Sequence, residues 1–333
     1  MSNMEKVRWG ILGTAEIAEL QLIPAILQSK NGEVAAISSR SGGGRAQVLA
    51  EKFAIPEVYS SYEDLLISED IDAVYVPLPN ELHAEWTKKA ASYNKHVLCE
   101  KPAGLTAEQV KDMVQTCKKH DVIFMEAMMY QFHPQHKLVK ELLDSGRIGE
   151  VKMMRASFTF TLQKWKGNFR LAPQTSGGGS IYDIGCYTIH AIRKVLGEPI
   201  KVLYVNETLT ENSETDIAAI GVFEHEKGIK SYFDCGMNMS RRNEYEIIGT
   251  NGTIRVPNAF IPTKDGEGIV QVISNDGSIS AEKVIANYYV EGVEYFSQHV
   301  LEKKELVAHA EETINNIQAV ESVLNWRKMN TFS

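Results

Sequence analysis

The segment 176–190, SGGGSIYDIGCYTIH, contains side chains that could take part in chemistry. Asp183, Tyr187 and His190 fall at i, i+4 and i+7, so a helix that starts near Ser180 would carry a carboxylate, a phenol and an imidazole on one face. Ser180 followed by Asp183 resembles a capping box. We expect this face to line a polar pocket. Taken singly, each residue also fits an ordinary role as a partner of the helix dipole, a core tyrosine or a surface histidine.

A lysine at the end of an apolar run is the second candidate. The run 96–104, HVLCEKPAG, reads as a buried strand that stops on Glu100, Lys101 and Pro102. Either the strand closes in an ordinary turn with Lys101 in solvent, or it delivers the lysine to a site. The residues of this stretch leave both interpretations open.

Length, charge and cysteine usage narrow the class of protein. A chain of 333 residues predicts two domains, and a net charge of −8 without a long basic run argues against binding to nucleic acid or to an anionic membrane. The four cysteines are scattered, which indicates buried thiols, no metal cluster and a reducing compartment. No apolar stretch approaches ~20 residues, so we expect neither a signal peptide nor a membrane span. A cytoplasmic protein is predicted.

Residues 1–126 alternate short apolar strands with helical periods. Near-continuous apolar strands separated by helices predict an α/β domain with a doubly wound parallel sheet. The expected strands are 7–12, 34–39, 73–78, 96–101 and 122–128.

Residues 127–333 show a different pattern, that of an α+β domain on a mostly antiparallel sheet. Helices are expected over 133–146 and 180–196, and one long helix over 301–328. The expected strands are 151–162, 201–210, 217–224, 229–236 and 244–249. We expect this domain to bind the substrate and to carry the oligomer contacts.

The turn after the first expected strand matches a dinucleotide fingerprint. The pattern G-x-G-x-x-G/A aligns as Gly13, Thr14, Ala15, Glu16, Ile17 and Ala18. Gly13 serves the tight turn, and the two alanines stand where the backbone must approach a pyrophosphate and the sheet closely. The following helix offers free N–H groups to the phosphates. These residues predict an NAD(P) site.

The end of the second expected strand bears on the choice between NAD and NADP. NAD enzymes usually place an acid there to bind the ribose 2′-hydroxyl. Here Ser39 and Arg40 occupy the position, and Arg45 begins the next helix. A guanidinium pairs well with phosphate oxygens, so NADP(H) is favoured over NAD(H). The alternative is that Arg40 is a solvated loop residue.

Five motifs, in this order and spacing, resemble the glucose–fructose oxidoreductase/inositol dehydrogenase (Gfo/Idh/MocA) family. They are GILGTAEIA, PLPNELH, LCEKP, MYQFHP and GGGSIYDIGCY, and the resemblance covers essentially the whole chain. The form Asp183…Tyr187 resembles the branch of dimeric dihydrodiol dehydrogenase and NADP-linked D-xylose dehydrogenase. The resemblance implies a catalytic Lys101 beside the nicotinamide, which favours delivery of the lysine to a site.

The resemblance also implies roles for further residues. Lys101 and Tyr187 are expected to be catalytic, and Gln131 departs from the arginine of many relatives. The residues expected to bind or shape the substrate pocket are Asp183, Arg170, His190, Phe132 and Trp165. Those expected at the cofactor, besides Gly13 to Ile17, Ser39 and Arg40, are Leu78, Pro79, Asn80, His83, Glu100 and Lys101.

The chemistry that these residues would perform is hydride transfer between NADP and a carbinol or carbonyl carbon of a sugar, a polyol or a cyclic trans-diol, without a metal. A phenol with a pKa near ~10 is a poor base, but a lysine cation within ~4–6 Å lowers that pKa by roughly one to three pH units. Tyr187 would then be the acid/base. The alternatives are a non-catalytic dinucleotide sensor, an NAD-linked glycosidase, and a dehydrogenase of inositol or another polyol. A homodimer or homotetramer is expected.

Overall fold

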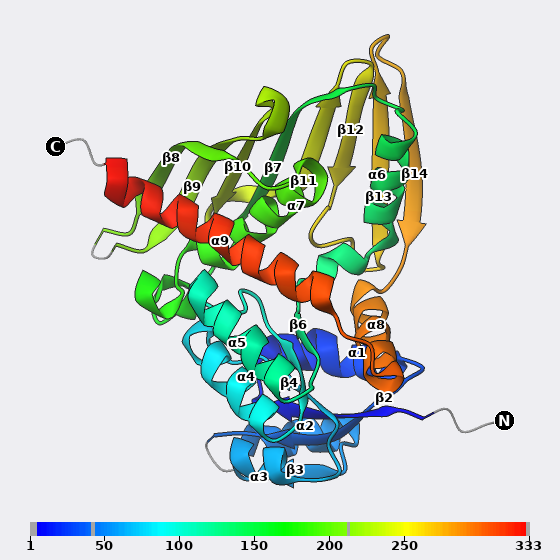
Figure 1. The fold of residues 1–333 in the computed structure, drawn as a ribbon, viewed down its shortest axis with the longest axis vertical. Helices are drawn as coiled ribbons and strands as arrows, with labels where there is room; N and C mark the ends of the chain where they lie inside the picture. The colour runs from blue at the N-terminus through cyan, green and yellow to red at the C-terminus, as the bar shows by residue number, and fades with distance from the viewer. Residues whose placement is uncertain (1–4, 41–43, 212–213, 331–333) are drawn as a thin grey trace. The chain divides into compact units, whose positions relative to one another are not determined.

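The computed structural model of the chain describes residues 5–40, 44–211 and 214–330. The chain divides into two compact units, which Figure 1 shows together with the course of the chain. The first unit consists of residues 1–129 and 287–314, and the second of residues 130–286 and 315–333. The sequence analysis assigned residues 127–333 to one domain, but segment 287–314 of that range belongs to the first unit.

The first unit is built on a parallel sheet, as predicted, but the sheet has six strands, and the short strand at residues 57–59 was not among the five expected from the sequence. The strand order is β3-β2-β1-β4-β5-β6, the order of a Rossmann dinucleotide-binding domain. The strands are β1 (Val7–Leu12), β2 (Gly32–Ser38), β3 (Glu57–Tyr59), β4 (Ala73–Val76), β5 (His96–Cys99) and β6 (Phe124–Glu126). All four residues of β4 are buried, as expected for a central parallel strand that is covered on both faces.

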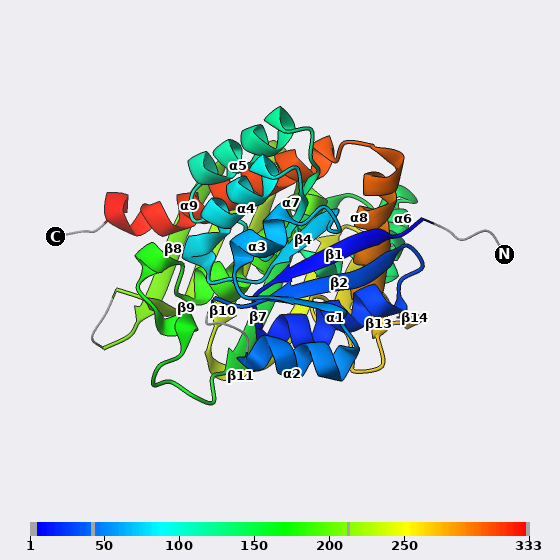
Figure 2. The same cartoon turned by 90° about the horizontal axis from the view of Figure 1, so that it is seen from below.

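Helices cover both faces of this sheet. Figure 2 shows α1 and α2 on one face and α3, α4 and α5 on the other. The helical elements of the first unit are η1 (Ala18–Leu22), α1 (Ile23–Gln28), α2 (Gly44–Phe53), α3 (Tyr62–Ile67), η2 (Asn80–Leu82), α4 (His83–Ser92), α5 (Ala107–Lys119) and α8 (Tyr288–Glu302). Helix α8 returns from the later part of the chain to pack on α1, where Phe296 meets Trp9 with 5.1 Å between ring centroids.

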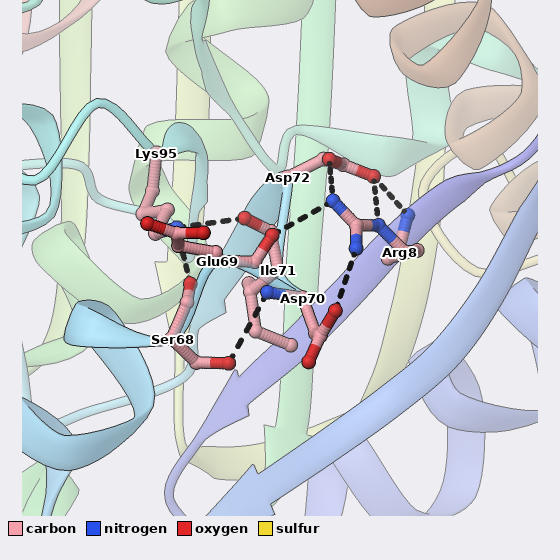
Figure 3. A network of polar contacts seen from close by, with 7 residues as sticks. All are labelled: Arg8, Ser68, Glu69, Asp70, Ile71, Asp72 and Lys95. Atoms are coloured by element: carbon pink, nitrogen blue, oxygen red, sulfur yellow. Dashed lines mark hydrogen bonds and ion pairs between the residues drawn. The ribbon is translucent and has the colours of Figure 1, made fainter.

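A polar network fastens the amino-terminal edge of this sheet (Figure 3). Arg8 of β1 donates from Nε and NH2 to the carboxylate of Asp72, at 3.0 and 2.8 Å, and from NH1 to Asp70 at 3.1 Å. Lys95 is buried, and its Nζ donates to the carbonyl oxygens of Ser68 and Ile71 at 2.6 and 2.8 Å. The network ties the segment before β4 to the starts of β1 and β5.

The second unit is built on an eight-stranded sheet that is mostly antiparallel, as predicted. Its order is β14-β13-β12-β11-β7-β10-β9-β8, and β7 and β10 form a parallel pair inside it. The strands are β7 (Val151–Thr161), β8 (Lys201–Leu209), β9 (Asp216–Glu224), β10 (Lys230–Gly236), β11 (Asn238–Gly249), β12 (Gly252–Pro257), β13 (Glu267–Ser274) and β14 (Ile279–Ile285). The last three strands were not among those expected from the sequence.

Helices pack on this second sheet. Helix α7 lies against β7 and β10, and α6 lies against β13 and β14. The helical elements of this unit are η3 (Met129–Phe132), α6 (Pro134–Asp144), η4 (Phe169–Leu171), η5 (Gln174–Ser176), η6 (Ile181–Gly185), α7 (Cys186–Leu196), η7 (Glu226–Gly228) and the part of α9 (Val307–Asn330) that follows residue 314.

The single long helix expected over 301–328 is wrong in its first part. Helix α8 ends at Glu302, Lys303 takes a left-handed conformation with φ 53°, and α9 starts only at Val307. A left-handed residue ends the hydrogen-bonded ladder of a helix. Apolar periodicity at the tail located α9 but did not reveal this break.

Two further expectations concern the thiols and membrane spans. All four cysteines are free and buried, as predicted. Among the residues that the structure describes, no helix has the length and apolar character needed to cross a bilayer.

The network of Figure 3 predicts a stability effect. Replacing Lys95 by methionine keeps an apolar stem but leaves the carbonyl groups of Ser68 and Ile71 without their donor, which costs roughly 1–3 kcal/mol. We expect Lys95→Met to lower the urea midpoint of unfolding accordingly. The control is Lys88→Met, because Lys88 pairs with Asp112 on the surface and such pairs contribute less than about 1 kcal/mol. Equal midpoints for the two variants would contradict the assignment.

His136 on α6 predicts a pH effect. Its Nδ1 contacts the Tyr245 hydroxyl at 2.9 Å and its Nε2 contacts the Ala259 carbonyl oxygen at 3.0 Å. Burial lowers the pKa of His136 from 6.5 to about 3. Below about pH 6.5 the unfolded chain therefore binds a proton that the folded chain does not, so the stability contributed by the neutral ring falls as the pH drops toward 3.

On acidification from about pH 7 to pH 5, we expect the unfolding free energy of His136→Gln to fall less than that of the parent. The difference between the two slopes should be at most ~1.4 kcal/mol per pH unit. Urea titrations at a series of pH values measure the slope. A variant with the slope of the parent would show that His136 does not titrate in this way.

Candidate functional site

The turn after β1 depends on a glycine. Gly13 has φ +110°, and its N–H donates to the Ser38 carbonyl at 2.9 Å. A Cβ at Gly13 would lie 3.2 Å from Leu78 Cδ2 and 3.4 Å from the Tyr62 hydroxyl. Only glycine accepts this φ without strain, and a glycine at this position makes the tight turn that a dinucleotide fold uses between its first strand and first helix. The turn therefore fits a dinucleotide.

A cavity of about 560 Å³ lies beside this turn. Thr14 and Ala15 are partly exposed, and the helix after them begins as a π-helix, η1, where an α-helix was expected. π-helical turns are rare and often occur at functional sites. The cavity is lined by Thr14, Glu16, Glu19, Leu20 and Arg45.

Helix α2, which follows β2, places cations near the same cavity. Ser39 is buried, whereas Arg40 is exposed. Arg45 pairs with Glu19 at 2.9 Å, and Lys52 pairs with the other carboxylate oxygen of Glu19 at 2.8 Å. Glu19 thus holds two cations at this rim, a feature that sequence reasoning missed.

The loop after β4 carries Leu78, Pro79 and Asn80, and it is tied to the loop after β5 by His83. The imidazole is fully buried. Its Nε2 lies 2.7 Å from the Leu78 carbonyl oxygen and its Nδ1 lies 2.8 Å from that of Pro102. Burial lowers the pKa of His83, and the positive charge of Lys101 lowers it further. His83 thus bridges two loops from inside the fold.

The turn that carries Lys101 is held by three buried side chains. The Tyr75 hydroxyl donates to Glu100 Oε1 at 2.5 Å, and the Ala103 N–H donates to Glu126 Oε1 at 2.8 Å. His83 contacts Pro102 as described. Lys101 is itself partly exposed, and its peptide bond to Pro102 is cis. The lysine therefore stands on a fixed backbone at the carboxyl edge of the sheet.

Burial and the neighbouring charge of Glu100 raise the pKa of Tyr75 well above its ordinary value. The phenol therefore keeps its proton and stays a donor to Glu100. This bond keeps the Glu100 carboxylate turned toward β4.

In the second unit, two of the predicted substrate residues form an ion pair. Arg170 Nε donates to Asp183 Oδ2 at 2.7 Å. The guanidinium also lies over the rings of Phe169 and Phe160, at 4.6 and 5.8 Å from their centroids. About a third of the Arg170 side chain is exposed, so the pair combines a fixed orientation with access from solvent.

Tyr187 lies in an aromatic cluster. Its ring centroid is 5.8 Å from that of Tyr130, 5.5 Å from Phe158 and 5.9 Å from Phe260. His190 is buried, and its Nδ1 lies 2.7 Å from the Tyr130 hydroxyl. His190 therefore contacts Tyr130, a residue that packs on Tyr187.

The remaining predicted pocket residues flank these groups in sequence. Phe132 ends η3 and is partly exposed, next to the partly exposed Gln131. Trp165 lies in the loop before η4 and is 41% exposed. Their roles stay predictions, as does the pairing of Lys101 in the first unit with Tyr187 in the second.

The expected capping box at Ser180 is wrong. Ser180 has helical φ and ψ of −68° and −30°, makes no cap bond, and donates its hydroxyl to Asp216 Oδ2 at 2.6 Å. The helix begins as a second π-helix, η6, which carries Asp183. The prediction paired Ser180 with its own helix, whereas in the structure its hydroxyl bonds to Asp216 of a strand that is distant in the sequence.

Sequence reasoning missed Tyr75, Glu126, Tyr130 and Asp216, none of which belongs to a short motif read as catalytic. Glu126 did carry a signal, because it is an acid inside the apolar run VIFMEAM. A charged residue in a buried strand needs a partner, and its partner is the Ala103 N–H beside the lysine turn. Within residues 5–40, 44–211 and 214–330, no group of three or more His, Cys, Asp or Glu could hold a metal ion.

Family models match both parts of the chain. Residues 7–128 match "Oxidoreductase family, NAD-binding Rossmann fold", and residues 136–255 match "GFO/IDH/MocA C-terminal domain". The chain is 34% identical over 318 residues to D-xylose 1-dehydrogenase (NADP(+)) 2 of Haloferax volcanii, and the match covers 95% of each chain. It is 28% identical over 261 residues to trans-1,2-dihydrobenzene-1,2-diol dehydrogenase of Mus musculus, a match that covers 78% of this chain and 77% of that one.

A solved structure gives the same result. A 3-ketoreductase from Actinomadura kijaniata, in complex with NADP and TDP-benzene, superposes with a TM-score of 0.91 at 30% identity. The superposition covers 96% of this chain and 98% of that chain. Relatives along the whole length are dehydrogenases and reductases, and the Rossmann sheet with its open glycine turn is present. The chain therefore belongs to the GFO/IDH/MocA family of NAD(P)-dependent oxidoreductases, as the resemblance indicated.

Proposed function

We propose that this protein transfers a hydride between NADP(H) and a carbinol or carbonyl carbon of a sugar or a cyclic trans-diol. The observation that carries the proposal is Lys101, held on a fixed turn at the carboxyl edge of the Rossmann sheet by Tyr75, His83 and Glu126. Ligands of doubly wound sheets bind at this edge. The related enzymes act, by their names, on D-xylose, a dideoxy-sugar nucleotide and a dihydrodiol.

In this proposal Tyr187 is the acid/base and Lys101 its electrostatic partner. When bound, the nicotinamide supplies or accepts the hydride. Tyr187 gives a proton to the substrate oxygen or takes one from it, and the Lys101 cation stabilises the phenolate and orients the substrate hydroxyl. The aromatic cluster around Tyr187 supports its ring from several sides and limits its orientation.

The Arg170–Asp183 pair is proposed to bind the substrate hydroxyls. Its carboxylate accepts and its guanidinium donates, so together they recognise neighbouring hydroxyl groups of a sugar ring. The polarity of this pair favours a polyhydroxylated substrate over an apolar alcohol.

For the cofactor, we propose that NADP(H) is preferred. Ser39 and the exposed Arg40 stand at the end of β2, and Arg45 lines the adjacent cavity. A hydroxyl and guanidinium groups suit a 2′-phosphate better than a ribose 2′-hydroxyl. The Haloferax volcanii relative is named for NADP(+), and the Actinomadura kijaniata structure contains NADP.

A panel of aldoses, deoxy-keto sugars and cyclic trans-diols, followed at the nicotinamide absorbance with both cofactors, tests the function. We expect turnover of at least one member, and loss of about 10²-fold or more in kcat for Lys101→Met, because the cation that stabilises the phenolate is gone. The NADPH dissociation constant should change much less.

The matched control is Lys118→Met, which removes a surface cation at the end of α5. Lys101→Met with the turnover of the parent would remove the lysine from the mechanism. Oxidation and re-reduction without net absorbance change would favour the glycosidase alternative.

Arg40→Ala tests cofactor preference. Loss of a guanidinium that pairs with the 2′-phosphate should weaken NADPH binding by about 1–3 kcal/mol and leave NADH binding nearly unchanged. Fluorescence titration with each cofactor measures the two constants. Arg147→Ala, an exposed arginine of the second unit, serves as control. Equal weakening of NADPH and NADH would contradict the proposed role.

A further inference from the structure

The carboxylate of Asp216 supplies the cap for the helix that carries Asp183 and Tyr187. Asp216 is the first residue of β9, and its side chain is buried. Its Oδ2 accepts from the Ser180 hydroxyl at 2.6 Å and from the Ile181 N–H at 2.8 Å. The first N–H groups of a helix have no partner within the helix, and a carboxylate both satisfies them and opposes the positive end of the helix dipole. Here that carboxylate comes from a strand 35 residues further along the chain.

The neighbouring Thr215 fastens the segment that carries Arg170. Thr215 Oγ1 donates to the Ala172 carbonyl at 2.9 Å. In the same loop, the Gly179 N–H donates to the Arg170 carbonyl at 2.8 Å. The segment that carries Arg170 and the start of the helix are thus held by two adjacent residues, Thr215 just before β9 and Asp216 at its start.

The glycines before the helix are required by this arrangement. A Cβ at Gly179 would lie 2.1 Å from Asp216 Oδ1, and one at Gly178 would lie 1.9 Å from the Ala172 carbonyl oxygen. No side chain fits at those distances. Two of the three glycines before the helix therefore make room for the loop and for Asp216.

Retaining Asp216 costs folding free energy. Its Oδ1 is buried without a hydrogen-bond partner, and burial raises the pKa of this carboxyl group. An unpartnered buried oxygen destabilises a fold, so a serine that capped its own helix would be the cheaper solution. Costly groups of this kind persist where they hold a functional geometry.

We propose that Asp216 is a positioning residue that sets the Arg170–Asp183 pair for substrate. Few bonds separate Asp216 from this pair. Asp216 accepts from the Ile181 N–H, and the Gly179 carbonyl accepts from the Asp183 N–H at 3.1 Å. Asp183 in turn pairs with Arg170. The inference rests on the proposed role of that pair in binding sugar hydroxyls. It assigns no contact between Asp216 and substrate.

Two variants of Asp216 and one of Ser180 test the proposal. Asp216→Ala removes the cap, and we expect the substrate KM to rise by about 10-fold or more, with NADPH affinity within about twofold of the parent. Asp216→Asn keeps an acceptor oxygen and should restore KM and kcat to within about twofold of the parent. Ser180→Ala removes one of the two donors and should be intermediate. Asp234→Asn, on the neighbouring strand, is the control for loss of a carboxylate.

A folded Asp216→Ala with the KM and kcat of the parent overturns the proposal, even if its melting temperature falls. An Asp216→Asn variant as impaired as Asp216→Ala overturns it too, because an acceptor oxygen at this place would then not be sufficient to position the start of the helix. If Asp216→Ala does not fold, Ser180→Ala decides, and an unchanged KM in that variant overturns the proposal.

Hydrogen exchange separates this inference from the proposed function. If the parent turns over no member of the sugar and diol panel, the proposed function fails and the positioning role falls with it. Exchange over 176–187 then still reports on the cap, because loss of the acceptor should speed exchange at Ile181. If the parent is active, exchange in Asp216→Ala as slow as in the parent contradicts the proposal.

Discussion

Three buried side chains hold the turn that carries Lys101, the lysine to which we assign a role in the proposed chemistry. A lysine on a mobile loop would have to lose backbone and side-chain entropy each time it met a substrate. Here Tyr75, His83 and Glu126 have already ordered the backbone on both sides of it. Because these three side chains are buried, water competes little for their hydrogen bonds. The conformational entropy of this turn is therefore lost when the chain folds and not when a substrate binds.

The helices next to both sets of functional residues start in the same unusual way. The π-helical segments η1 and η6 follow the dinucleotide turn and the glycine loop, respectively. A π-helical turn shifts the side chains and carbonyl groups that follow it relative to an α-helix. At η6 the start of the helix is also fastened by Asp216 from β9. A local π-helical turn and a long-range bond therefore both bear on the segment that carries Asp183.

Much of the fold could be predicted because its causes are local. Apolar runs located the strands of the parallel sheet, and the spacing around Gly13 located the dinucleotide turn. Features set by distant parts of the chain could not be found in this way. The sequence offered the Ser180 hydroxyl one partner, the start of its own helix, but the hydroxyl donates to Asp216 instead. The break at Lys303 has a similar origin, since apolar periodicity carries no information about a left-handed residue. The resemblance pointed to Lys101 and Tyr187 but not to the side chains that hold the turn at Lys101.

Arg8, Asp72 and Lys95 fasten the first sheet at the ends of its strands opposite to the loops that bear the working groups. The side chains that anchor this sheet and the loops to which we assign the chemistry therefore lie at opposite edges of it. Substitutions that accumulate in the loops after β1, β2 and β4 leave this anchoring untouched. A lineage with such a division can drift toward new substrates without first losing its ability to fold, which helps a single architecture diversify over many alcohols and ketones.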